Sequence, residues 1–298
     1  MSLRRILLQN KNNIALVIGN GSNRYGNAKE VNSWDHLLLK LATKFNIPGG
    51  ENIPDGITLT EFYDLLELRK PVKNSAKIHL QKEFCAGMDE WRVFPHHERI
   101  VRWAQTNSVP ILTTNFDSVF SRVGNFPLFP ERNQSFTDYY PWERYYADRP
   151  LDRPDLGFGI WHINGMEKYR RSIRLGLTHY MGSVERVRNW VHKGNERRLF
   201  SGKNDNNWVG VNTWLHIVFN KPLVIFGLGL EENEVFLRWL LIERARYFRN
   251  FPHRKQLAWF IYTSENEKAG KLYFLEGLGI DAVKVPDYDD IYGEGIWR

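Results

Sequence analysis

Residues 14–23 read Ile14-Ala-Leu-Val-Ile-Gly-Asn-Gly-Ser-Asn23, a short apolar run that ends in a glycine-rich turn. The pattern returns at Pro110-Ile-Leu-Thr-Thr-Asn-Phe-Asp117 and at Pro222-Leu-Val-Ile-Phe-Gly-Leu-Gly-Leu230. Each run predicts a buried parallel strand whose carboxyl end opens into a loop. Ligands of open α/β sheets bind at that edge. In this order, the turns therefore predict a nucleotide site.

Helical and strand-like segments alternate along the rest of the chain. We expect helices over 33–45, 58–69, 75–84, 96–106, 178–192, 208–219, 231–248 and 265–278, and the last strands over 256–262 and 280–285. This alternation predicts one α/β domain over 1–298 with a Rossmann-like, doubly wound parallel sheet. The stretch 27–107 is too long for one crossover and predicts an inserted helical subdomain. Residues 123–156 are rich in Pro, Tyr, Asp and Arg without a clean period, and predict a long loop or lid.

Composition excludes several classes of protein. Hydrophobic residues make up 42% and charged residues 25% of the 298 residues, which is ordinary globular usage without a sign of disorder. Cys85 is the only cysteine, so the chain has no internal disulfide and no four-cysteine zinc ribbon. The sequence shows no secretory signal and no apolar run long enough to cross a bilayer. We therefore expect a cytoplasmic protein without a membrane partner.

The formal net charge of +7 fits nucleic-acid binding, attraction of an anionic dinucleotide, or a soluble surface. Basic residues gather at 168–174 and 186–198, beside Tyr169, Trp190 and Phe200. A solvated helix face is the commoner cause of such clusters. Direct nucleic-acid binding stays an alternative, although no recognised nucleic-acid motif accompanies these residues.

Polar side chains follow the second apolar run. Asn115 and Asp117 lie two residues apart, directly after Thr114, and Gly159-Ile-Trp-His-Ile-Asn-Gly165 adds a histidine on another short strand. This set, in this order, resembles the sirtuin-like family of NAD-consuming proteins. The resemblance covers most of the chain.

Two further segments carry the resemblance beyond the strand ends. Ser172-Ile-Arg-Leu-Gly-Leu-Thr-His-Tyr180 and the run from Phe226 to Arg244 are similar to the bacterial branch of the family that is associated with antiphage defence. The resemblance to the protein deacetylases of the family is smaller, since many of those carry the zinc ribbon that this chain lacks.

The resemblance implies that NAD is bound and consumed as a substrate, without a metal. Asn115 would position the attacking water and Asp117 would hold the nicotinamide side. Cleaving the bond between nicotinamide and ribose builds positive charge on the sugar, which an enzyme must stabilise. Asn and Asp also cap helices and shape turns, so a purely structural role for both residues remains an alternative.

The glycine-rich turns would hold the rest of the dinucleotide. Glycines let the backbone approach a pyrophosphate, and free amides there donate to its oxygens. The expected contacts with NAD are Gly19, Gly21, Ser22, Asn23, Thr114, Gly227, Gly229 and Leu230. The loop from Gly227 would contact the adenosine half of NAD. Alternatively, its glycines only allow tight packing of a helix against a strand. Glu231, Glu232 and Glu234 could contact a ribose hydroxyl or favour the start of a helix.

The histidine departs from the family pattern. In the family the catalytic histidine directly precedes a glycine, whereas here Asn164 precedes Gly165 and the histidine is His162. Residues two apart on a strand share a face, so His162 could line the same pocket, displaced by about 6 to 7 Å. An amide is no general base near neutral pH. Either His162 serves, or NAD is turned over poorly, or Asn164 is an altered residue; His162 could also be a core histidine.

The sequence leaves two functions open. The first is an NAD glycohydrolase that releases nicotinamide and ADP-ribose, an antiphage effector that depletes NAD. The second is a catalytically weak or inactive subunit that binds NAD or ADP-ribose in a defence complex. For either function we expect a homo-oligomer or a partner protein such as an ATPase or a nucleic-acid-guided sensor.

Overall fold

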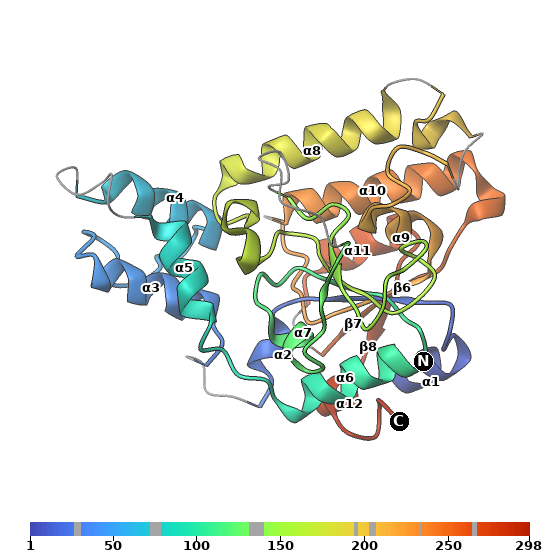
Figure 1. Ribbon diagram of the computed structural model, residues 1–298, viewed down its shortest axis with the longest axis horizontal. Coiled ribbons are helices and arrows are strands. Elements are labelled where there is room, and N and C mark those ends of the chain that lie inside the picture. Colours follow the sequence, from blue (N-terminus) through green and yellow to red (C-terminus); the bar gives the residue numbers. More distant parts are fainter. Residues whose placement is uncertain are drawn as a thin grey trace.

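Eight strands form one mixed sheet, most of which is parallel, in the computed structural model of this α/β protein (Figure 1). The structure describes residues 1–26, 31–71, 79–130, 140–193, 196–202, 207–232, 234–263 and 267–298. The sheet order is β3-β4-β5-β2-β1-β6-β7-β8. The strands are β1 (Ala15–Ile18), β2 (Ile111–Thr113), β3 (Leu128–Phe129), β4 (Tyr145–Tyr146), β5 (Ile160–His162), β6 (Leu223–Phe226), β7 (Ala258–Tyr262) and β8 (Asp281–Lys284).

The central strands end at one edge of the sheet. Ile18 at the end of β1 is paired in register with Thr113 of β2 and with Phe226 of β6, and all three strands are parallel. The loops that follow are therefore neighbours. The Gly21 amide donates to the Gly227 carbonyl at 2.7 Å. The prediction that these turns gather at the carboxyl edge is confirmed.

The expectation of a wholly parallel sheet is wrong at one edge. The short strands β3 and β4 pair antiparallel with each other, and β4 pairs antiparallel with β5. Both lie in the stretch 123–156, which we expected to be a loop or lid. Two-residue strands are too short to leave an alternating pattern in the sequence. Part of that stretch, residues 131–139, lies outside the described residues.

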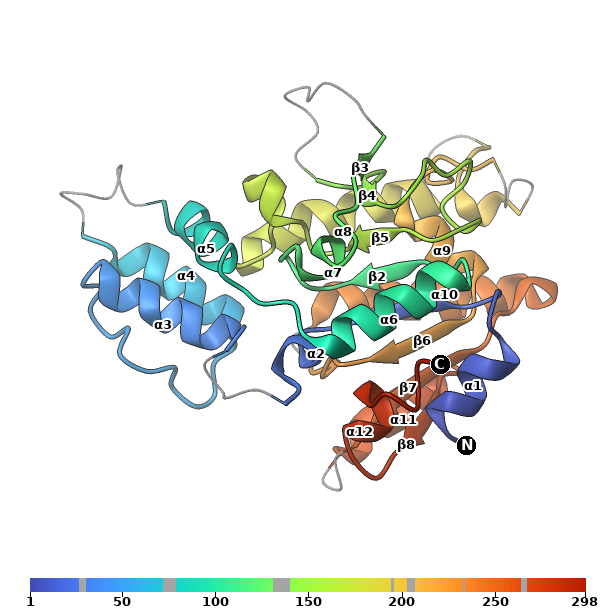
Figure 2. The same ribbon diagram turned by 60° about the horizontal axis from the view of Figure 1, so that its bottom comes forward.

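Helices cover both faces of the sheet (Figure 2). On one face, α1 (Leu3–Gln9), α6 (Pro95–Thr106) and α12 (Asp289–Tyr292) share a core with alternate residues of the strands. On the other face, α8 (Leu177–His192), α9 (Trp214–Asn220), α10 (Val235–Asn250) and α11 (Ala269–Gly277) form a second core. Strands β1 and β6 are buried along their whole length, as their unbroken apolar runs require.

Helices α3 (Trp34–Lys44), α4 (Leu59–Arg69) and α5 (Leu80–Met88) stand together beside the sheet, at the left of Figure 1. They bury a third core of their own, which also takes in Phe116 after β2 and Ile173 before α8. Thr58 and Glu61, which have the spacing of a capping box, form that motif at the start of α4. The start of the helix expected over 75–84 falls on 72–78, outside the described residues; α5 continues to Met88.

Three helix starts differ from the expectation, and one of them is that of α11, which begins at Ala269 instead of at 265. The segment expected to be helical over 208–219 is helical only from Trp214, and α10 begins at Val235 rather than at Glu231. Short helices α2 (Gly21–Arg24) and α7 (Val119–Arg122) follow β1 and β2. Among the described residues, no helix is both long and apolar enough to span a membrane.

Candidate functional site

The first glycine turn packs directly against the turn after β6. A Cβ atom at Gly19 would lie 2.4 Å from the Leu228 Cβ and 2.5 Å from the Gly227 carbonyl oxygen, so residue 19 must be glycine for the two loops to meet. The amides of Gly21 and Ser22 donate to Gly227 and Gly19, respectively. The expectation of free amides is therefore wrong for these residues, because Gly21 bonds to the facing loop and Ser22 bonds within its own turn.

Polar side chains tie the first turn to the loop after β2. Asn23 is wholly buried, and its Nδ2 donates to Asp117 Oδ2 at 2.9 Å. Asp117 Oδ1 accepts from the Val119 amide at 3.0 Å, at the start of α7. Burial raises the pKa of the Asp117 carboxyl. Both Asp117 oxygens thus bond within the protein, as in the structural alternative of the sequence analysis.

Two histidines hold the first turn from the other side. His96 Nε2 and His97 Nε2, at the start of α6, lie 2.6 and 3.0 Å from the Ser22 carbonyl oxygen. A carbonyl only accepts, so both nitrogens carry a proton. Burial lowers the pKa of both imidazoles, that of His97 to about 3. These neutral rings fix the position of Ser22, and no motif in the sequence marks them as part of the site.

Asn115 lies at the carboxyl end of β2, and its side chain is wholly buried. Its amide nitrogen in the backbone donates to Thr113 Oγ1, and its carbonyl accepts from His162. Neither Oδ1 nor Nδ2 of its side chain has a hydrogen-bond partner among the described residues. A buried amide without hydrogen bonds costs about 1 to 3 kcal/mol. Thr114 beside it is also buried, and its backbone amide donates to Ile18.

His162, the last residue of β5, is buried in the core. Its Nδ1 lies 2.8 Å from the Asn115 carbonyl oxygen, so Nδ1 carries the proton and Nε2 is the unprotonated nitrogen. Nε2 has no hydrogen-bond partner among the described residues, and burial lowers the pKa of the ring to about 4. The ring packs edge-on to Tyr146 at 5.9 Å between centroids.

The side chains of Asn164 and His162 lie in different places because the chain turns after His162. Strand β5 ends at His162, and Gly165 follows with a φ of 98°, a conformation that favours glycine. Asn164 lines a cavity that His162 does not line. In this structure the two side chains therefore do not line the same cavity.

The cavity beside Asn164 lies between the helical group α3–α5 and the carboxyl edge of the sheet. Its volume is about 110 Å³. Side chains from both parts line it: Trp34, Leu38, Leu59, Thr60, Phe84, Phe116, Asn164, Arg174, Leu175, Tyr180 and Glu234. An engineered cavity of about 150 Å³ holds a benzene ring, so this space is of the size of a single ring.

Aromatic rings form one wall of this cavity. Trp34 from α3 stacks on Phe116 with 4.7 Å between ring centroids and 14° between planes, and Phe84 meets Phe116 edge-on. The cavity is also lined by polar groups: the amide of Asn164, the guanidinium of Arg174 and the carboxyl group of Glu234. The cavity thus offers a flat apolar surface together with hydrogen-bonding groups, as ligand sites do.

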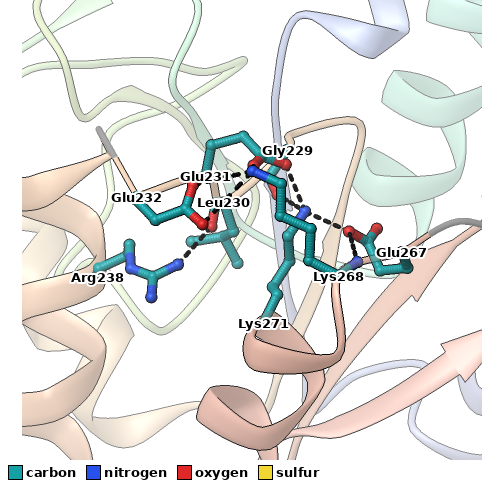
Figure 3. Close-up of polar contacts among 8 residues, drawn as sticks. All are labelled: Gly229, Leu230, Glu231, Glu232, Arg238, Glu267, Lys268 and Lys271. Carbon is teal, nitrogen blue, oxygen red and sulfur yellow. Dashed lines mark hydrogen bonds and ion pairs between the residues drawn. The ribbon is translucent and has the colours of Figure 1, made fainter. Parts of the chain in front are cut away.

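Lys271 of α11 and Lys268, which directly precedes this helix, hold the loop between β6 and α10 (Figure 3). The buried Lys271 Nζ bonds to the Gly229 carbonyl oxygen and to Glu231 Oε1, each at 2.6 Å, and also pairs with Glu267. Lys268 pairs with Glu231 and Glu232 at 3.0 and 3.2 Å.

This network explains the late start of α10. Arg238 Nη1 donates to the carbonyl oxygen of the buried Leu230 at 2.8 Å, which ties the loop back onto α10 as well (Figure 3). Glu231 and Glu232 are thus used in ion pairs with lysines, whereas Glu234 lines the cavity. All three glutamates were candidates from the sequence, which contains no signal that distinguishes their roles.

A second, open cleft of about 490 Å³ lies between α5, α7 and the 3₁₀ segment Glu167–Ser172. Glu167 lines it, and burial raises the pKa of that carboxyl group to about 7. None of the site residues predicted from the sequence lines this cleft. The smaller cavity, which is lined by Asn164 and by Phe116, the residue after Asn115, is therefore the candidate site.

Comparison with protein-family models gives no match for this chain, and a search of curated proteins gives no significant match.

Proposed function

We propose that this protein binds NAD across the carboxyl edge of its sheet and cleaves the bond between nicotinamide and ribose. The parallel strands run β5-β2-β1-β6-β7-β8, which in chain order is 3-2-1-4-5-6, the order of Rossmann-like, doubly wound sheets. The helices α3–α5 form an insertion in this domain. Dinucleotides bind where the strand order reverses, which here lies between β1 and β6.

The observation that carries the proposal is the side chain of Asn115. It is wholly buried at the carboxyl edge, and its amide oxygen and nitrogen have no hydrogen-bond partner among the described residues. Buried polar groups are nearly always paired, and exceptions are enriched at functional sites. Asn115 does not line the cavity itself, so a ligand there would reach its amide only if Phe116 moved aside. An attacking water or the carboxamide of nicotinamide would then supply the missing partners.

The size of the cavity sets how NAD would bind. About 110 Å³ accommodates the nicotinamide ring, whereas drug-sized ligands occupy about 300 to 1,000 Å³. The pyrophosphate would lie at the turns that contain Gly21 and Gly227. Because these turns are hydrogen-bonded to each other, they have to part before their amides face the ligand.

The reaction follows from the charge of the substrate. The nicotinamide ring of NAD is cationic, and it leaves as neutral nicotinamide when the bond breaks and its electron pair moves to the ring. The positive charge passes to the ribose, and water adds at the same carbon and releases a proton, which gives ADP-ribose. Asn115 would orient that water. Depletion of NAD in antiphage defence is the role that we propose for this activity.

A second candidate function is a subunit that binds NAD without cleaving it. The observation in its favour is the identity of the lining residues: Asn164 faces the cavity, and His162 is buried elsewhere with its Nδ1 bonded to Asn115. The cavity thus lacks the histidine that would serve as a general base.

The test is release of nicotinamide from NAD by the purified protein, alone and with candidate partner proteins. We expect release by the wild type and none by Asn115→Ala, while thermal unfolding shows that the variant is folded. Equal release by the two proteins would contradict the assigned role of Asn115. Binding of NAD by calorimetry without any release would favour the binding subunit.

A further inference from the structure

Glu234 is the one acidic side chain that lines the candidate cavity within the described part of the chain. It precedes α10, directly after the loop that Lys271 and Arg238 hold in place (Figure 3). Unlike Glu231 and Glu232, its carboxyl group has no hydrogen bond or ion pair with any described residue. Burial and the nearby Glu231 raise its pKa. A cation bound in this ring-sized cavity would favour the ionised form of this carboxyl group and would in turn be held by it.

The walls around Glu234 suit a flat cationic group. Trp34, Phe84, Phe116 and Tyr180 line the same space of about 110 Å³. The face of an aromatic ring carries negative potential and attracts cations, Trp most strongly. A cationic ring would therefore meet favourable electrostatics from the aromatic wall and from the carboxylate.

Arg174 also lines the cavity, and its positive charge, which its neutral partners do not cancel, opposes a cation there. It donates to the His179 carbonyl oxygen and to Ser183 Oγ, and it lies over the Tyr140 ring at 4.4 Å from the centroid. These contacts hold its charge at the α8 side of the cavity.

We infer that Glu234 sets the charge preference of this cavity, so that the site takes the cationic nicotinamide ring of oxidised NAD and discriminates against the neutral ring of NADH. This inference rests on the proposed binding of NAD. Glu234 is a specificity-determining residue in this view, since it distinguishes two ligands that differ in the ring alone.

The experiment measures binding by calorimetry of NADH and of carba-NAD, a cationic NAD analogue that is not cleaved at this bond. The proteins are the wild type, Glu234→Gln and, as a matched control, Glu232→Gln, which removes a carboxylate from the same loop outside the cavity. We expect the wild type to prefer carba-NAD. Glu234→Gln should lose at least about tenfold in affinity for carba-NAD, which is about 1.4 kcal/mol, and keep its affinity for NADH. Glu232→Gln should keep both affinities.

The outcomes separate the inference from the proposed function. If Glu234→Gln keeps its affinity for carba-NAD, or weakens the binding of both ligands equally, the charge preference is not set by Glu234 and the inference is overturned, while NAD binding stands. If the wild type binds neither ligand, the proposed NAD site is wrong and the inference falls with it. Thermal unfolding of each variant shows whether a loss of binding reflects a loss of fold.

Discussion

Replacing Asn115 with leucine should stabilise the protein while it removes the proposed activity. Leucine has nearly the shape of asparagine but no polar atoms. In the folded chain the Asn115 side chain is wholly buried, and neither polar atom bonds to a described residue. Its backbone hydrogen bonds to Thr113 and His162 do not involve the side chain and remain in the variant.

The expected size follows from the cost of burying an unpaired amide. That cost is about 1 to 3 kcal/mol, and imperfect packing of leucine takes back up to about 1 kcal/mol. The difference spans about 0 to 3 kcal/mol, and from the middle of that span we expect the free energy of unfolding to rise by about 1 to 2 kcal/mol. In a chain of this size, such a gain raises the melting temperature by about 2 to 4 °C.

The assay is urea unfolding followed by circular dichroism, with thermal unfolding as a second measurement. Asn23→Leu is the matched control, because it is a buried asparagine of the same site whose Nδ2 donates to Asp117 and Asn20. Removing it leaves the buried Asp117 carboxyl group without that donor, so this variant should lose about 1 to 3 kcal/mol.

A destabilisation of 1 kcal/mol or more by Asn115→Leu, about as large as that of the control, would refute the reasoning. It would mean that the Asn115 amide is satisfied in the folded protein and supports the fold. The residue would then no longer mark a binding site.

Three further predictions follow from the same region. Asn164→His should restore or increase NAD hydrolysis by roughly 10²- to 10⁴-fold and His162→Ala should not abolish it, measured as nicotinamide release; the reverse result would make His162 the base. The folded-state pKa values of His97 and His162 are about 3 and about 4, below the usual value of about 6.5. Below pH 6.5 the unfolded chain therefore binds more protons than the folded chain. The free energy of unfolding should fall as the pH is lowered from about 6.5 to about 4, by on the order of 3 kcal/mol for His162 alone. Urea titrations that show constant stability over this range would contradict the burial of neutral rings. Gly19→Ala should lower the free energy of unfolding by about 1 to 3 kcal/mol, because the new Cβ would lie 2.4 Å from Leu228. Gly182→Ala, which is in open space on α8, should raise it by roughly 0.5 to 1 kcal/mol. Urea unfolding measures both changes.

The sequence by itself determined the elements with strong local signals. The apolar runs that end in Gly or Asn became β1, β2 and β6, because burial on both faces demands unbroken apolar residues. The capping box at Thr58 placed the start of α4 at the right residue, since a cap depends on neighbours three positions away. The gathering of Gly21, Asn115 and Gly227 followed from the rule that parallel strands end at one edge.

Only the tertiary structure decided what each polar side chain does. Asp117 and Asn115 lie two residues apart, yet the first bonds to Asn23, 94 residues away in the chain, and the second has no partner among the described residues. Glu231 and Glu234 follow the same strand, but Glu231 pairs with Lys271 from α11, whereas Glu234 lines the cavity. The short antiparallel strands and the cavity wall formed by α3–α5 depend equally on segments that meet across the fold. Side-chain roles are set by partners distant in sequence, which a local pattern does not contain.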